Sequence, residues 1–173
     1  MNAEKMTQKA MEALEAAHAD AVRKGHPELT TLHLLQALLE QEHGLTGNLL
    51  GKMGKDPGML KQAVSEELGK LPTFNGASGR VAASGGMNQV LVRSDDEAKQ
   101  LGDEYVSVEH LLLAILEEGK SGPAGRLLQE HSIRRKELLK TLEDVRGGQR
   151  VTNRNPEDTF EALEKYGSDL TLL

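Results

Sequence analysis

The chain contains an internal repeat, and this repeat restricts its possible folds more than any single motif does. Residues 30–40 (TTLHLLQALLE) recur as residues 107–117 (SVEHLLLAILE), at an offset of 77 residues. The offset also matches Gly25 with Gly102 upstream, and one inserted residue lengthens it to 78 downstream. The sequence therefore predicts two equivalent halves related by a pseudo-twofold axis.

The composition favours helices in both halves. Hydrophobic residues make up 38% of the 173 residues, and aromatic residues only 2%. Alanine and leucine are abundant while β-branched residues rarely cluster, which is typical of helices packed through aliphatic side chains. We expect an all-α protein with eight helices, four in each repeat, followed by a C-terminal linker tail.

The first helix of each repeat is marked at both ends. Thr7 and Ser84 are hydroxyl residues suited to the N-cap, and apolar residues follow them at helical spacing. Gly25 and Gly102 stand where the helices should end, because a left-handed backbone is common at that position.

The second helix begins at Thr30 or Ser107 and is apolar on nearly every side. A helix of this kind belongs at the centre of its repeat. We therefore predict four buried core residues on the second helices: Leu34, Leu38, Leu111 and Ile115. The third and fourth helices are expected around residues 49–50 and 127–128, and over residues 57–68 and 134–145.

Loop-forming residues divide the chain into segments. Repeat one is assigned to residues 1–69 and repeat two to residues 84–146, so that together they form one repeat domain over residues 1–146. Between them, residues 70–83 are rich in Gly, Ser, Asn and Pro and are predicted as a linker. Residues 147–173 begin with two glycines and are predicted as a second linker, with a short helix over about 157–166.

Charge and composition exclude several classes of function. The net charge of −6 disfavours a nucleic-acid partner, because the phosphate backbone would be repelled. The absence of cysteine excludes disulfides, thiolate zinc sites and cysteine nucleophiles. No stretch approaches the roughly 18 apolar residues of a membrane span. We expect no membrane partner and a cytoplasmic location.

Two features could suggest catalysis. Residues 119–121 (GKS) end like a phosphate-binding loop, but that loop needs a glycine where this chain has Ala114, and it needs a preceding strand. The six histidines include no pair at the three- or four-residue spacing of metal ligands. A Ser-His-Asp arrangement is spatial and stays open, although no serine has the strand-turn-helix context of a nucleophile. We expect no metal site and no enzymatic activity within this chain.

Two acidic residues stand beside the second helix of repeat two. Asp103 follows Gly102, and Glu109 lies at the second helical position, where its charge complements the helix dipole. Their repeat-one counterparts are His26 and Leu32. The acidic pair is therefore not required by the repeat fold.

Three apolar residues are expected on the surface. Val92 lies off the apolar stripe of its helix, and Leu71 and Phe74 lie in the linker between the repeats. Exposed apolar groups of this kind can form a recognition patch.

The paired glycine-terminated helices, the hydroxyl caps and the run EHLLLAIL at residues 109–116 resemble the Clp N-terminal repeat domain. The resemblance covers residues 1–146. The run NPED at residues 155–158 and the run ALEKYGSDLT at residues 162–171 look like the connection into the first ATPase module of ClpB-type AAA+ disaggregases.

The resemblance implies a substrate-capturing N-terminal domain of an ATP-dependent chaperone that disaggregates and helps to refold stress-denatured proteins. The longer parent would be a homohexamer that uses ATP and Mg²⁺ and works with an Hsp70-type system. This chain would be a monomer without a cofactor that binds exposed apolar segments of unfolded or aggregated polypeptides. The resemblance implies a role for Thr7, Asp103 and Glu109, and their expected exposure suggests Phe74 and Val92 as substrate contacts.

An alternative is the adaptor-docking domain of a protease-linked ClpC- or ClpA-type ATPase, which would bind one folded partner specifically. In those relatives the connection after the domain is shorter and differently spelled. Groove-facing positions that are apolar in some ClpB relatives are here Arg93, Glu97 and His110.

Overall fold

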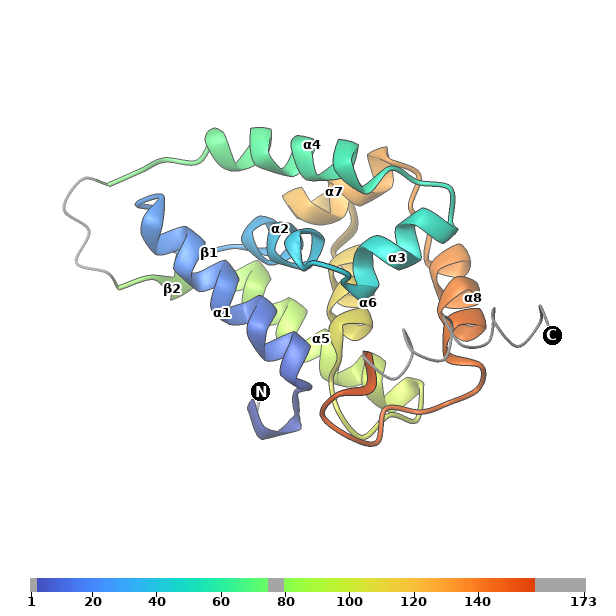
Figure 1. Ribbon diagram of the computed structural model, residues 1–173. Helices are drawn as coiled ribbons and strands as arrows, with labels where there is room; N and C mark the ends of the chain where they lie inside the picture. The colour runs from blue at the N-terminus through green and yellow to red at the C-terminus, as the bar shows by residue number, and fades with distance from the viewer. Residues whose placement is uncertain (1–2, 75–79, 158–173) are drawn as a thin grey trace.

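The computed structural model describes residues 3–74 and 80–157, which form eight α-helices in the order that the repeat predicts (Figure 1). The repeat-one helices are α1 (Gln8–Arg23), α2 (Thr31–Glu40), α3 (Leu45–Lys52) and α4 (Pro57–Gly69). The repeat-two helices are α5 (Gly85–Gln100), α6 (Val108–Glu118), α7 (Pro123–Glu130) and α8 (Arg135–Arg146). The prediction of an all-α fold built from two four-helix repeats is confirmed.

The predicted caps set the bounds of the first helices. Thr7 Oγ1 accepts a hydrogen bond from the N–H of Ala10 at 3.2 Å, and Ser84 accepts the equivalent bond at 3.0 Å. At the other ends, Gly25 has φ +70° and Gly102 has φ +73°. A side chain is disfavoured in this left-handed region, so glycine lets each chain leave its helix sharply.

The second helices, α2 and α6, form the centre of the molecule (Figure 1). Each begins with a capping box in which the third helical residue is a histidine, His33 in α2 and His110 in α6. All four predicted core residues have no exposed surface: Leu34, Leu38, Leu111 and Ile115. The histidines thus replace the usual Glu or Gln of the box and stay buried within it.

Two parallel backbone contacts join the repeats and reveal their pseudo-twofold relation. Strand β1 (Glu28–Leu29) pairs with strand β2 (Ala82–Ala83), and Met6 bridges Val106. Under the 77-residue offset Met6 corresponds to Ala83 and Leu29 to Val106, so the two contacts are equivalent. The N–H of Thr7 donates to the carbonyl of Val106 at 2.9 Å, and the N–H of Ser84 donates to the carbonyl of Leu29 at the same distance.

Some elements differ from the sequence expectation or fall outside the described part of the chain. Strands of two residues carry no periodic signal, so β1 and β2 were not predicted. Two short 3₁₀ helices, η1 (Ala3–Lys5) and η2 (Gly119–Ser121), were also not predicted. Most of the helix expected over residues 157–166 lies outside the described residues. Within the described ranges, no helix has the length and apolar character needed to cross a membrane.

Candidate functional site

The chain after α8 turns back across the molecule to the start of α6 and the N-terminal end of α1 (Figure 1). We call residues 150–157 the 150–157 segment. Thr7, Asp103 and Glu109 come together where this segment meets the two repeats, and all three are buried. The three residues that the resemblance implied for the role of this domain therefore belong to one cluster.

Asp103 is the acceptor at the centre of this cluster. Its Oδ2 accepts a hydrogen bond from His110 Nε2 at 2.6 Å, and its Oδ1 accepts one from the N–H of Val151 at 2.9 Å. Arg146 Nη1 lies 2.9 Å from Oδ2. Burial alone would raise the pKa of Asp103, but the bonds from His110 and Val151 and the charge of Arg146 hold it below its ordinary value.

The tautomer of His110 follows from its hydrogen bonds. The backbone N–H of Ser107 donates to His110 Nδ1 at 2.8 Å, so this nitrogen carries a lone pair and Nε2 carries the proton. The neutral ring therefore donates to Asp103. His110 has no exposed surface, so it does not face a groove. Arg93 and Glu97 on α5 line a surface pocket together with Arg135 of α8.

Glu109 is held by the same arginine. Its Oε2 accepts from Arg146 Nη2 at 3.0 Å, while its Oε1 has no hydrogen-bond partner. One guanidinium, at the last residue of α8, therefore bridges the carboxylates of Asp103 and Glu109. The role of Glu109 is a buried ion pair, in addition to its favourable place at the α6 N-terminus.

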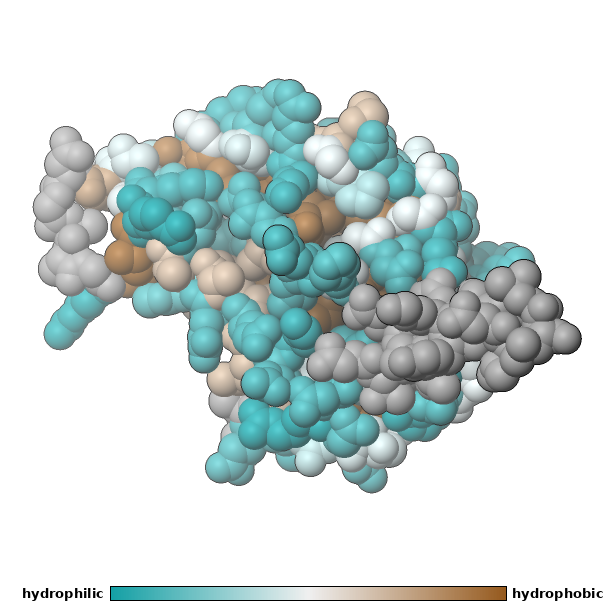
Figure 2. Space-filling model, viewed as in Figure 1, coloured by the Kyte–Doolittle hydropathy of each residue, from teal (hydrophilic) through white to brown (hydrophobic). Residues whose placement is uncertain are grey.

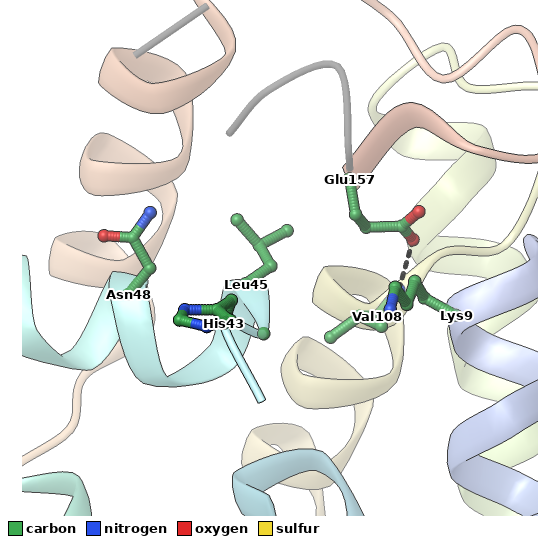
Figure 3. Close-up of a pocket in the computed structure, with 7 residues that line it drawn as sticks. Lys9, His43, Leu45, Asn48, Val108 and Glu157 are labelled. Atoms are coloured by element: carbon green, nitrogen blue, oxygen red, sulfur yellow. Dashed lines mark hydrogen bonds between the residues drawn. The ribbon is translucent and has the colours of Figure 1, made fainter. Parts of the chain in front are cut away.

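Thr7 links the cluster to the 150–157 segment. Its Oγ1 caps α1 and also donates to Glu157 Oε1 at 2.8 Å. The N–H of Val108, at the start of α6, donates to the same oxygen at 3.3 Å. Figure 3 shows the Glu157 side chain reaching Val108 beside Lys9, with the start of α3 across the pocket.

Glu157 has an unusual electrostatic environment. Burial, followed by the negative charge of Glu109, raises the pKa of Glu157 to about 7, although the bonds from Thr7 and Val108 oppose the shift. Its Oε2 has no partner. The carboxyl group therefore changes from its protonated to its ionised form near neutral pH.

Backbone hydrogen bonds hold the rest of the segment against both repeats. The N–H of Gln8 donates to the carbonyl of Arg154 at 2.8 Å, and the N–H of Glu104 donates to the carbonyl of Val151 at 2.8 Å. These bonds flank the bridge between Met6 and Val106. The segment thus covers one of the two equivalent contacts between the repeats.

The equivalent cluster in repeat one is uncharged. His26 Nδ1 lies 2.8 Å from His33 Nε2, in the place of Asp103 and His110. Burial, and then the neighbouring His26, lower the pKa of His33 to about 4. The histidine cap thus belongs to the repeat fold, whereas the acidic pair is a feature of repeat two alone.

The described residues contain a Ser-His-Asp contact, formed by Ser107, His110 and Asp103. Ser107 and His110 have no exposed surface, and Thr30 and His33 repeat the arrangement in the other half. The contact is a helix cap that no substrate can reach.

Residues 119–121 form η2 after a helix, without the strand of a phosphate-binding loop. No group of three or more potential ligands in residues 3–74 and 80–157 could hold a metal ion.

Phe74 and Val92 lie outside this cluster. Phe74 donates its N–H to the carbonyl of Gly25, at the end of α1, and its side chain is 60% exposed. Val92 lies on α5 and is 63% exposed, while Leu71 is half-buried. The structure therefore separates the sequence-selected residues into a buried polar group and exposed apolar residues.

Sequence reasoning missed Arg146 and Glu157 as members of the site. Arg146 stands four residues after Leu142 and eight after Leu138, on the buried face of α8. The sequence did contain a signal for Arg146, since a charged residue there continues the apolar stripe of α8 and a buried arginine needs an acidic partner. Glu157 had no comparable signal, since its contacts depend on how the chain turns after α8.

Comparison with known proteins defines the class. The family described as the Clp repeat (R) N-terminal domain matches residues 5–131. This chain therefore belongs to that family. The N-terminal domain of Hsp104 from Candida albicans has the same fold, with a TM-score of 0.78 and 24% identity over 88% of this chain and 99% of that chain.

Sequence relatives narrow the class to the ClpB type. The chain is 49% identical to the chaperone protein ClpB of Nitratidesulfovibrio vulgaris, over 98% of this chain and 20% of the relative. It spans about a fifth of the length of the curated relatives that it matches. A solved complex of a ClpV N-domain with a VipB peptide also shares the fold, with a TM-score of 0.63 and 21% identity over 81% of this chain and 86% of that chain. The expectation of a ClpB-type Clp N-terminal domain is confirmed.

Proposed function

We propose that this domain captures exposed apolar segments of non-native polypeptides for a ClpB-type chaperone. The observation that carries the proposal is the strong exposure of Phe74 and Val92, at 60% and 63%. On the face shown in Figure 2, hydrophilic residues dominate and hydrophobic surface is confined to small areas. Exposed large apolar side chains on such a surface are suited to binding.

The strength of this binding follows from the area available. Complete burial of a valine or phenylalanine side chain contributes about 1.5–3 kcal/mol, and these two side chains are already partly covered. Ordering an unfolded client offsets much of that gain. We expect dissociation constants in the high micromolar range that change little with salt, because apolar burial is not screened.

The role of the whole protein is also a proposal. We propose that residues 1–146 form the capture domain and that residues 147–173 connect it to an ATPase module in a longer chain. That module would use ATP and Mg²⁺ in a homohexamer and would act with an Hsp70-type system. The relatives named chaperone protein ClpB support this assignment. We propose that the domain itself is a monomer without cofactor or catalytic activity.

A second candidate is specific docking of one folded partner, as expected of the adaptor-docking domain of a protease-linked ClpC- or ClpA-type ATPase. The solved complex of a ClpV N-domain with a VipB peptide supports it, because a defined peptide occupies a domain of this fold. A specific partner would bind tightly and saturate one site, whereas capture of non-native segments would tolerate many sequences.

The test is a titration of the fluorescently labelled chain with a permanently unfolded client and with the same protein folded. Phe74→Asp and Val92→Asp should weaken binding of the unfolded client several-fold. Met59→Asp is the matched control, because Met59 is equally exposed, at 61%, but lies on α4 instead of on α5 or in the linker between the repeats. Equal loss in all three variants, or equal binding of folded and unfolded client, would refute the proposal.

A further inference from the structure

We propose that the 150–157 segment is a releasable intramolecular ligand of the repeats, docked through the Glu157 side chain, and that Thr7, Asp103 and Glu109 are positioning residues for it. Its release would free the two repeats from the chain that follows residue 157. Docking and release of the segment do not depend on the proposed function. Only the idea that released repeats capture clients more freely rests on it.

The segment contacts the repeats at its two ends and at Arg154, whose carbonyl accepts from the N–H of Gln8 at 2.8 Å and whose Nε donates to the carbonyl of Met6 at 3.3 Å. Val151 is fully buried and bonds through both its N–H and its carbonyl, to Asp103 and Glu104. Glu157 is 5% exposed and is bound by Thr7 and Val108. Between them, residues 152–155 are exposed. Only a valine and Pro156 supply buried apolar surface, so polar contacts to a few residues hold the segment.

The Glu157 site has an equivalent in the other half of the molecule, where Glu118 supplies the carboxylate. Glu118 Oε1 accepts from Thr31 Oγ1 at 3.1 Å and from the N–H of Gly125 at 3.0 Å. Thr31 is the repeat counterpart of Val108, and Gly125 in α7 is the counterpart of Gly47 in α3. A carboxylate thus occupies an equivalent position at helix N-termini in both halves, as the helix dipole favours.

The two sites differ in the origin of their carboxylate. Glu118 is the last residue of α6 and is fixed by that helix. Its repeat-one counterpart is Gln41, whose amide donates to the carbonyl of Lys9 at 2.9 Å. Repeat one therefore supplies no carboxylate of its own at this position, and the 150–157 segment brings Glu157 to fill it. One site is permanent and the other depends on docking.

Charges around Glu157 make this docking reversible. Glu109 on α6 repels it, and Arg146 on α8 divides its single positive charge between Glu109 and Asp103. Lys9 and His43 line the same pocket from repeat one. Glu157 Oε2 and Glu109 Oε1 are both buried without a partner, so the docked state keeps an uncompensated polar cost.

The test uses the 173-residue chain without client and measures amide exchange and backbone order parameters by NMR. Thr7→Ala removes one helix cap and one bond to Glu157, whereas the control Ser84→Ala removes only the equivalent cap. Thr7→Ala should speed exchange at Glu104, Val108 and Val151 by about 10- to 100-fold, because bonds to charged groups are the strong ones. Order parameters in the segment should fall below about 0.6.

Glu157→Ala gives a second route to the same state without touching α1. It should reproduce the exchange and order parameters of Thr7→Ala, while the Leu38 amide inside α2 stays protected and shows that the repeats remain folded. Equal effects of Thr7→Ala and Ser84→Ala, or an ordered segment in Glu157→Ala, would overturn the inference. No client is present in this experiment, so its result neither supports nor refutes the proposal that the domain captures clients.

Discussion

Replacement of Arg146 tests whether the buried charges are held as the structure indicates. Arg146 has a side chain only 4% exposed and is bonded to both Asp103 and Glu109. Arg146→Met keeps much of the apolar stem but leaves two buried carboxylates without their cation. Breaking a buried ion pair in this way costs about 3–5 kcal/mol, a large part of the about 5–15 kcal/mol that stabilises a domain.

The assay is urea unfolding at pH 7, followed by circular dichroism. Arg126→Met is the matched control, because Arg126 also lies near two carboxylates, Glu67 and Glu130, but its side chain is 48% exposed and neither carboxylate is buried. Its loss should cost only about 1 kcal/mol. Adding Glu109→Gln to Arg146→Met should recover part of the stability by removing one unpaired charge. A loss for Arg146→Met no larger than for Arg126→Met would refute the reasoning.

The raised pKa of Glu157, about 7 against an ordinary 4.5, means that docking of the 150–157 segment is strongest below about pH 4.5 as far as this group is concerned. Docking should weaken by about 3 kcal/mol as the pH rises to about 7 and should then level off. The lowered pKa of Asp103 weakens docking only in stronger acid. NMR chemical shifts of the segment measured against pH would check this, and docking that strengthens between pH 4.5 and 7 would contradict it. Gly125→Ala should destabilise the fold by about 1–3 kcal/mol, because the added Cβ would lie 2.6 Å from the backbone of residue 119, while the equivalent Gly47→Ala has open space and should be neutral or stabilising in thermal melts. Leu111→Asp should unfold repeat two by burying an unpaired charge, and a native circular dichroism spectrum for this variant would contradict the core assignment.

The fold could be predicted from the sequence because the caps, the helix-ending glycines and the apolar periodicity each depend on residues close together in the chain. Thr7 and Ser84 cap helices within three residues of themselves, and Gly25 ends a helix at its own position. Periodicity placed Leu34 and Leu111 in the core, since a helix apolar on every side has no solvent face. Each of these inferences needs only a few neighbouring residues.

The site could be predicted only in part because its contacts join distant residues. Thr7 and Glu157 are 150 positions apart, and Glu109 and Arg146 are 37 apart. Position alone suggested that Glu109 complements the α6 dipole, and it could not show that an arginine from α8 binds the same carboxylate. The family resemblance implied a role for Asp103 and Glu109, and their absence from repeat one showed that the repeat fold does not require them. Neither observation revealed which groups they bind.

The central claim is that the exposed apolar residues contact clients while the buried polar cluster holds the 150–157 segment. The most direct test is NMR shift mapping of the 173-residue chain during titration with a permanently unfolded client. We predict that the largest shifts surround Phe74 and Val92, with the amides of Gln8, Val108 and Val151 unchanged. Shifts centred on those three amides, with none near Phe74 or Val92, would contradict the claim.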